Sequence, residues 1–154
     1  PTFVDAGLDL NNGTLMVMFS EFVNASTWDF RRISLVSGGF NVTLDGAVLI
    51  DTGFGEQVVL QVTEEHRAAV TAEVAAGSDV LVTLTTGFVR DFAGNDADSV
   101  SAQNATLAMD VTSPTFVDAG LDLNNGTLMV KFSEFVNAST WDFSRISLAS
   151  GGFN

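Results

Sequence analysis

The sequence predicts an all-β protein, an antiparallel β-sandwich of seven or eight short strands with one short helix, built from a unit that recurs in tandem. Three observations predict this class. Short stretches alternate between apolar and polar residues, and turn signals separate them at the spacing of roughly 8–12 residues that sandwiches show. The opening residues of the chain also return near its end.

The internal repeat predicts the domain organisation. Residues 1–41 recur as residues 114–154 with three differences, which are Met18/Lys131, Arg31/Ser144 and Val36/Ala149. The offset is 113 residues (114 minus 1), the size of an independently folding domain. We therefore expect a complete unit at residues 1–113 and the N-terminal third of a near-identical unit at 114–154. Because such a third cannot close a core alone, we expect the chain to be a segment of a longer tandem array.

Composition limits the partners. The chain has 46% hydrophobic residues, 13 Phe, no Cys, and a net charge of −13. Such an acidic protein repels phosphate backbones, which argues against nucleic acid and anionic membranes as partners. The absence of Cys excludes disulfides and thiolate metal sites but is compatible with an extracellular location. No apolar run approaches the length of a transmembrane helix, so no membrane insertion is expected in this segment.

Turn residues and alternation predict the order of elements. A single helical turn is expected at 24–30, with Trp28 and Phe30 facing inward. A short helix is expected at 64–76, because this Ala- and Glu-rich stretch ends at Gly77, a favoured helix C-cap. The expected strands are 2–10, 14–20, 32–37, 40–44, 47–50, 57–62, 79–85 and 105–111, with a turn at 52–55, and residues 88–91 are expected to continue from 79–85 to a loop at 93–96.

The two copies of the repeat indicate which face of the second strand is buried. Leu15, Val17 and Phe19 point to one side, and Met16 and Met18 point to the other. Lys131 replaces Met18 in the second copy, and lysine is almost never fully buried. The Leu15 face is therefore the predicted core face. In the last strand, Leu107, Met109 and Val111 are expected to point inward.

Two segments carry a family resemblance. Residues 19–24 read FSEFVN, and residues 89–95 read VRDFAGN. Together they resemble the bacterial-Ig-like repeats found in tandem in surface-layer proteins, large adhesins and giant surface proteins of algae and other protists. Phe22 departs from the family pattern, where Pro or Thr is commoner. The resemblance implies an Ig-like sandwich, an extracellular or cell-surface location, and neighbouring copies of the same repeat as partners.

Asparagines in the pattern N-x-[ST] are more frequent than chance suggests. One interpretation is N-linked glycosylation in a secretory pathway. The other is ordinary turn and cap chemistry, in which Asn, Ser and Thr side chains bond to nearby backbone groups. The sites are Asn12, Asn24, Asn41, Asn104, Asn125 and Asn137.

Acidic residues gather near the end of the unit and suggest calcium. Carboxylate and amide oxygens are the ligands that Ca²⁺ takes, usually six to eight of them. The alternative is that these side chains are solvated turn formers, since no loop has the D-x-D-x-D-G spacing of a dedicated site. The predicted structural role requires no cofactor, and calcium and N-linked glycans are the two candidate additions. The candidate ligands are Asp91, Asn95, Asp96 and Asp110.

The sequence offers little for catalysis. His66 is the single histidine and has no nucleophile near it in the sequence, and Glu21, which recurs as Glu134, stands alone at a strand end. We expect that this protein is not an enzyme. The predicted function is a structural repeat unit of a long extracellular protein that forms a cell-surface filament, appendage or lattice. The alternative is a ligand- or carbohydrate-binding adhesin module, in which Trp28 and the phenylalanines would stack on sugars.

Overall fold

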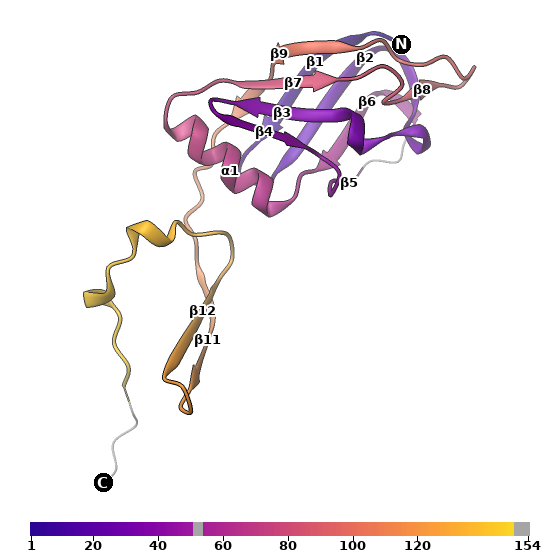
Figure 1. Cartoon of the computed structure of the whole chain (residues 1–154). Helices are drawn as coiled ribbons and strands as arrows, with labels where there is room; N and C mark the ends of the chain where they lie inside the picture. Colours follow the sequence, from indigo (N-terminus) through magenta and orange to yellow (C-terminus); the bar gives the residue numbers. More distant parts are fainter. Residues whose placement is uncertain (51–53, 150–154) are drawn as a thin grey trace. The chain divides into compact units, whose positions relative to one another are not determined.

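A computed structural model describes residues 1–50 and 54–149 (Figure 1). The chain divides into two units, Pro1–Ser113 and Pro114–Asn154, called unit 1 and unit 2 below. Within residues 1–50 and 54–113, unit 1 holds two sheets, one α-helix and two 3₁₀ turns. Unit 2 holds one hairpin and two 3₁₀ turns among its described residues. No helix in the described ranges is long and apolar enough to cross a membrane.

The first sheet of unit 1 has six strands. Its order is β10-β1-β2-β6-β5, and β8 pairs with the far end of β2. The strands are antiparallel except for β1 and β10, which run parallel. Their bounds are β1 Phe3–Asp9, β2 Thr14–Asn24, β5 Val48–Leu49, β6 Phe54–Gln61, β8 Arg90–Asp91 and β10 Thr106–Ala108.

The second sheet of unit 1 has four antiparallel strands in the order β4-β3-β7-β9. These are β4 Phe40–Thr43, β3 Ile33–Ser37, β7 Val80–Leu84 and β9 Val100–Asn104. Helix α1, Glu64–Ala75, connects β6 to β7. The 3₁₀ turns η1, Ala25–Thr27, and η2, Phe30–Arg32, connect β2 to β3.

The core of unit 1 is a single cluster to which both sheets contribute. Leu15 and Val17 of β2 are fully buried, as are Leu35 of β3 and Val82 of β7. Phe19 is 3% exposed, so the predicted core face of β2 is confirmed. Each of these strands buries alternate residues, because successive side chains of a strand point to opposite faces of its sheet.

An aromatic group closes one part of this core. The rings of Phe19 and Phe88 lie 5.8 Å apart, and the indole of Trp28 meets Phe88 edge-on at 5.6 Å. The ring centre of Phe30 lies 6.4 Å from that of Trp28. Trp28 and Phe30 are both half-buried against the cluster. The predicted inward orientation is therefore confirmed, although two 3₁₀ turns replace the expected single helical turn.

The fold class is confirmed at its coarse level, as a mostly β protein with antiparallel sheets and one α-helix. Helix α1 lies within the expected range 64–76, and Gly77 follows it with φ +93°. The described residues of unit 1 form ten strands, more than the seven or eight expected. The parallel pairing of β1 with β10 also departs from a purely antiparallel sandwich.

The expected strand at 105–111 is present only in part, as β10, Thr106–Ala108. The chain crosses here between sheets: the Ala105 N–H donates to the Val80 carbonyl, while Thr106 is already opposite Gly7 of β1. Leu107 is half-buried, but Met109 is 50% and Val111 is 83% exposed. Strand β9 was not predicted, because its residues are mostly exposed and polar, as on a sheet edge.

The expected turn at 52–55 is also wrong in part. Its first two residues, 52 and 53, lie outside the described ranges. Strand β6 begins at Phe54, earlier than the expected start at 57, because the end of β2 provides a partner there. Phe54 is opposite Asn24, and Gly55 is opposite Val23. Tertiary pairing thus extends the strand beyond its alternating segment.

Unit 2 repeats the local structure of unit 1 but not its sheets. Strands β11, Phe116–Asp122, and β12, Thr127–Phe132, pair in the register of β1 and β2, with Leu121 opposite Leu128 as Leu8 is opposite Leu15. The 3₁₀ turns η3, Ala138–Thr140, and η4, Phe143–Arg145, correspond to η1 and η2. Residues 146–149 form no strand, whereas their counterparts in unit 1 begin β3.

Candidate functional site

Residues 90–96 of unit 1 form a loop whose charged and polar side chains bond to one another. Asp91 accepts hydrogen bonds from Asn95, through its backbone N–H at 2.8 Å and its side-chain amide at 2.6 Å. These two bonds hold the pKa of the Asp91 carboxyl below its usual value. Arg90 donates to Asp96 across the same loop at 2.6 Å. The side chains predicted to bind calcium here therefore already have partners within their own loop.

The fourth candidate ligand, Asp110, lies at the other end of β2. Asp91 is opposite Val23, near the end of β2, while the chain around Asp110 contacts the turn that precedes its start. No group of three or more His, Asp or Glu among the described residues is arranged to hold a metal ion. The structure thus brings Asp91, Asn95 and Asp96 together and leaves Asp110 apart. Calcium binding stays a prediction.

Asp110 instead belongs to a buried cluster centred on Arg67. Arg67 of α1 is only 6% exposed, and its guanidinium donates to the Leu10 carbonyl at 2.6 Å and to the Asp110 carboxylate at 2.9 Å. Glu64, one helical turn earlier, accepts from Arg67 Nε at 2.6 Å. A buried cation requires such partners, because desolvation of its charge is costly.

The Arg67 cluster anchors the last residues of unit 1. Thr112 donates its hydroxyl and its N–H to Asp110, and these bonds together with Arg67 hold the pKa of Asp110 below its usual value. Asn11 also bonds this segment, donating to the Met109 carbonyl at 2.8 Å and accepting from the Val111 N–H at 2.9 Å. Residues 109–112 are therefore held to α1 and to the β1–β2 turn.

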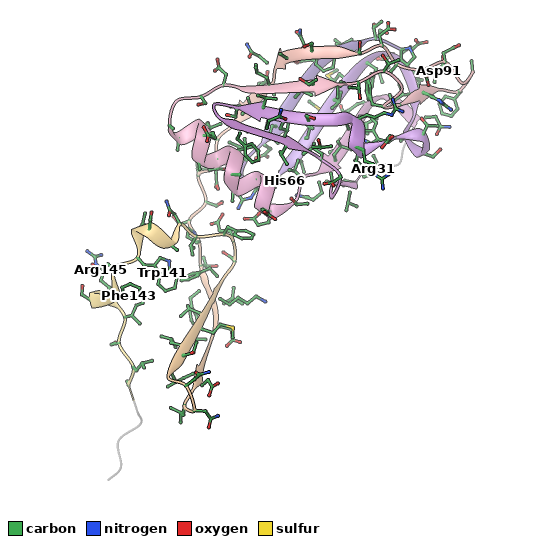
Figure 2. The ribbon with its side chains drawn as sticks, in the orientation of Figure 1. Arg31, His66, Asp91, Trp141, Phe143 and Arg145 are labelled. Carbon is green, nitrogen blue, oxygen red and sulfur yellow. The ribbon has the colours of Figure 1, made fainter. Side chains whose placement is uncertain are left out.

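Sequence reasoning missed Arg67. A signal was present, because Arg67, Val70 and Val74 are spaced as i, i+3 and i+7, the pattern of the core-facing side of a helix. An arginine in that stripe, preceded by Glu64 at i−3, indicates a buried ion pair. His66, in contrast, is half-buried on α1 (Figure 2), and its Nδ1 has no hydrogen-bond partner in the described structure.

The six N-x-[ST] asparagines are mostly accessible. Asn24 is half-buried and the other five are exposed. At Asn12, Asn24 and Asn137, the side-chain oxygen accepts a hydrogen bond from the backbone N–H two residues later, which is turn and cap geometry. This geometry fits the second interpretation and leaves the glycosylation prediction open. The sites are Asn12, Asn24, Asn41, Asn104, Asn125 and Asn137.

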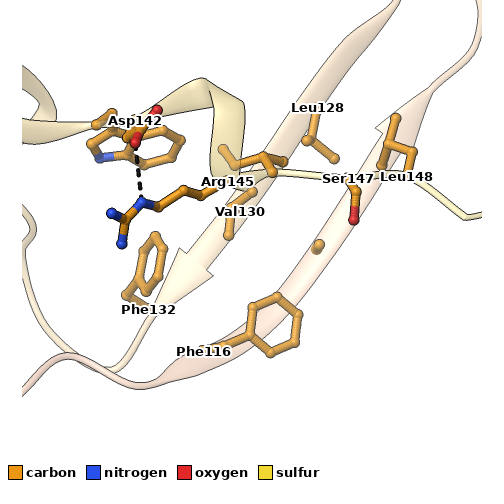
Figure 3. Close-up of a pocket in the computed structure, with 11 residues that line it drawn as sticks. Phe116, Leu128, Val130, Phe132, Asp142, Arg145, Ser147 and Leu148 are labelled. Carbon is orange, nitrogen blue, oxygen red and sulfur yellow. Dashed lines mark hydrogen bonds and ion pairs between the residues drawn. The ribbon is translucent and has the colours of Figure 1, made fainter.

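Unit 2 contains an apolar groove (Figure 3). Its volume is about 590 Å³, and it lies between the β11–β12 hairpin and the segment of η4 with the residues after it. Phe132 and Trp141 meet edge-on at its wall, with ring centres 6.0 Å apart. The lining residues are Phe116, Ala119, Leu128, Val130, Phe132, Trp141, Asp142, Arg145, Ile146, Ser147 and Leu148.

The same face is closed in unit 1. Leu15, Val17 and Ile33 are fully buried there, and they correspond to Leu128, Val130 and Ile146 of the groove. Leu148 is 66% exposed, whereas its counterpart Leu35 is fully buried. The groove is thus the core face of the repeat without the residues that cover it in unit 1.

Comparison of the chain with protein families, with curated proteins and with solved structures gives no match.

Proposed function

We propose that this chain is a structural segment of a tandem array of Ig-like β-sandwich units, in an extracellular protein that forms a cell-surface filament, appendage or lattice. The observation that carries the proposal is the repeat itself. Thirty-eight of 41 residues recur at an offset of 113, and both copies form a hairpin in the same register and the same pair of 3₁₀ turns. The resemblance of residues 19–24 and 89–95 to bacterial-Ig-like repeats supports the same role.

The Arg67 cluster fits this mechanical role. In an array, tension passes from one unit to the next through the residues that leave the fold. The segment 109–112 is held by Arg67, Asn11 and the internal bonds of Asp110 with Thr112. A segment held in this way leaves every unit in the same direction. Identical junctions propagate one rotation and one rise, which produces a rod or a helical filament.

Electron microscopy of a protein with residues 1–113 repeated four times tests the proposal. We expect rods with a constant rise and rotation per unit. Deletion of Val111, Thr112 and Ser113 should change that rotation, because it removes the second half of the anchored segment together with the link from that segment to Pro114. An unchanged rise and rotation after the deletion, or flexible strings of units with no constant rotation before it, would contradict the array.

A second candidate function is a ligand- or carbohydrate-binding adhesin module. The observation that favours it is an aromatic pair at one end of the first sheet. Phe22 and Phe92 adjoin the paired residues Val23 and Asp91, and each phenylalanine is 56% exposed. Exposed rings offer stacking surface to sugars, although phenylalanine lacks the polar group that tyrosine and tryptophan add. Binding to a glycan array that Phe22→Ala abolishes would favour this candidate.

A further inference from the structure

Two of the six N-x-[ST] asparagines differ from the other four in their local structure. In those four, the side-chain oxygen accepts a hydrogen bond from the backbone N–H two residues later; they are Asn12, Asn24, Asn125 and Asn137. Asn41 and Asn104 lie in strands β4 and β9, and neither forms such a bond within the described ranges. Because asparagine is depleted in strands, turn and cap chemistry does not explain these two positions.

Asn41 and Asn104 lie at the two ends of one row of residues that crosses the second sheet of unit 1. Val36 of β3 is opposite Asn41 on one side and opposite Leu81 of β7 on the other. Leu81 is in turn opposite Asn104. Directly opposite residues share a face of a sheet, and this is the outer face, because the alternate residues of β3 and β7 form the core.

The two asparagines are accessible on this outer face. Both are exposed, whereas Val36 and Leu81 between them are half-buried. Three strand spacings of ~4.8 Å separate Asn41 from Asn104, which gives about 14 Å. A bulky group on each asparagine would therefore flank the apolar pair Val36 and Leu81 from both sides.

The hydroxyl residue of each motif is accessible as well. Thr43 follows Asn41 by two residues in β4, and Thr106 follows Asn104 by two residues at the start of β10. Both threonines are exposed. Residues two apart in a strand point to the same face, so Asn41 and Thr43 both point to solvent. The folded unit thus leaves both complete motifs at its surface.

Both asparagines also lie on edge strands. The order of the sheet is β4-β3-β7-β9, so β4 and β9 form its two edges (Figure 1). An edge presents unpaired N–H and C=O groups to other chains, and proteins usually protect it with charged residues, Pro or a very short strand. The end strands of the first sheet, β5 and β10, are protected in this way, because they have only two and three residues.

The edges of the second sheet lack these devices. Strands β4 (FNVT) and β9 (VSAQN) have four and five residues, and neither contains a charged residue or Pro. Strand β9 pairs irregularly with β7, which disturbs that edge, but β4 pairs regularly with β3. In a chain with 19 acidic residues, each of these uncharged edges contains an N-x-[ST] asparagine instead.

We propose that Asn41 and Asn104 carry N-linked glycans, and that these glycans protect the edges and the outer face of the second sheet from association with other chains. A glycan is bulky and solubilising, so it serves at an edge as a charged side chain does elsewhere. This inference rests on the proposed extracellular location, because N-linked glycans are added in a secretory pathway.

The chain supplies only the acceptor amide for this modification. A transferase of the secretory pathway joins the side-chain nitrogen of asparagine to the anomeric carbon of a lipid-linked oligosaccharide diphosphate. The bond between that carbon and the diphosphate oxygen breaks, the lipid diphosphate leaves, and the amide nitrogen loses one proton. Nothing is oxidised or reduced in this step.

Glycopeptide mass spectrometry of the full chain, secreted from cultured eukaryotic cells, tests whether the two sites are occupied. Enzymatic removal of N-glycans in H₂¹⁸O converts each glycosylated asparagine to labelled aspartate, and we expect this label at Asn41 and Asn104 in most molecules. Thr43→Ala with Thr106→Ala, the alanine pair, should abolish the label at both sites. Thr43→Ser with Thr106→Ser, the serine pair, should keep it, because serine retains the hydroxyl of the motif. A bare asparagine at either site in the original chain would overturn the proposal.

Sedimentation velocity of the same secreted proteins tests whether the glycans prevent association. Every variant contains the same unit 2, so a difference between variants reports on unit 1. We expect the alanine pair to self-associate at a protein concentration at least about threefold lower than the serine pair, because its two edges are bare. Equal association of the two pairs would overturn the proposal. The rise and rotation of the proposed array are measured separately and do not require glycans.

A charged side chain at the same edges provides a matched control. Asn41→Lys with Asn104→Lys removes both glycans but places a charge on each edge, so this variant should stay as dispersed as the serine pair. Gln57→Lys with Ala75→Lys, added to the alanine pair, places the same charge at exposed positions of β6 and α1. This second variant should associate as the alanine pair does. Equal association of the two lysine variants would show that the edges are not the surfaces that associate, and would overturn the proposal.

Discussion

Two leucines at the same position of the repeat occupy different environments in this chain, which provides a matched test of the fold. Leu15 of unit 1 is fully buried in the core, and Leu128 of unit 2 lines an open groove. Both follow the sequence NNGT and precede MV. We predict that Leu15→Ala strongly destabilises unit 1, while Leu128→Ala leaves the stability of unit 1 unchanged.

The size of the effect follows from the burial of Leu15. Removal of a fully buried leucine side chain loses its transfer free energy and leaves a cavity, which together cost about 3 kcal/mol. A domain of 113 residues has an unfolding free energy of roughly 6–17 kcal/mol. The loss is smaller than this, so unit 1 should remain folded in the variant. The corresponding decrease in Tm is about 10 °C.

Urea unfolding followed by tryptophan fluorescence measures this difference. Trp28 packs against Phe19 and Phe88 and so reports on the core of unit 1. Trp141 of unit 2 would add its own signal, so every variant should carry Trp141→Phe. We expect Leu15→Ala to lower the urea midpoint by roughly 2 M at a slope near 1.5 kcal/mol per M. Equal midpoints for the Leu15→Ala and Leu128→Ala variants would refute the assignment of the core face.

Three further predictions use the same assay. Arg67→Met should lower the unfolding free energy of unit 1 by about 3 kcal/mol, because it leaves the Asp110 carboxylate and the Leu10 carbonyl without their buried donor. The pKa of Asp110 lies below its ordinary value of 3.8, so the ionised carboxylate stabilises unit 1 above that pH. We expect this stability to be lost as the pH falls through the lowered pKa. If the Arg67→Met variant loses stability on acidification as steeply as the original chain, Arg67 plays no part in this effect. Gly13→Ala should cost unit 1 about 2 kcal/mol, because its φ of +70° is a left-handed conformation that strains an L side chain, and the new Cβ would lie 3.0 Å from Gln61 Nε2. Gly126→Ala, with φ +72° and nothing within 4 Å, is its control and should leave the transition of unit 1 unmoved.

Local features of the fold could be predicted from the sequence. The Asn-Asn-Gly turn and the alternation of residues 14–20 predicted the hairpin that both units form. The Ala- and Glu-rich composition of residues 64–76 predicted α1. The replacement of Met18 by Lys131 identified the core face. The turn, the hairpin and the helix depend on interactions between residues that are close in the chain. The core face of β2 follows from the preference of a charged lysine side chain for water.

The candidate site could be predicted only in part. Asp91, Asn95 and Asp96 were expected to lie together, and they do, because they share one short loop. Asp110, beside the junction, was a further candidate for the same ion, but its partner is Arg67, 43 residues earlier in the chain. Sequence spacing does not say which distant carboxylate a buried guanidinium will meet, since that depends on how α1 packs against the chain near Leu10.

The sequence by itself determined the repeat, the hairpin and its turn, the helix and the face of β2 that is buried. Only the tertiary structure decided where β6 begins, how the chain crosses from β9 to β10, and that Arg67 holds the end of unit 1. The two copies of the repeat show the physical reason. Nearly identical residues form the same hairpin in both units, but β2 runs to Asn24 while β12 stops at Phe132. Local sequence specifies the turn and register of a hairpin, whereas a longer strand and a closed core require partners from distant parts of the chain.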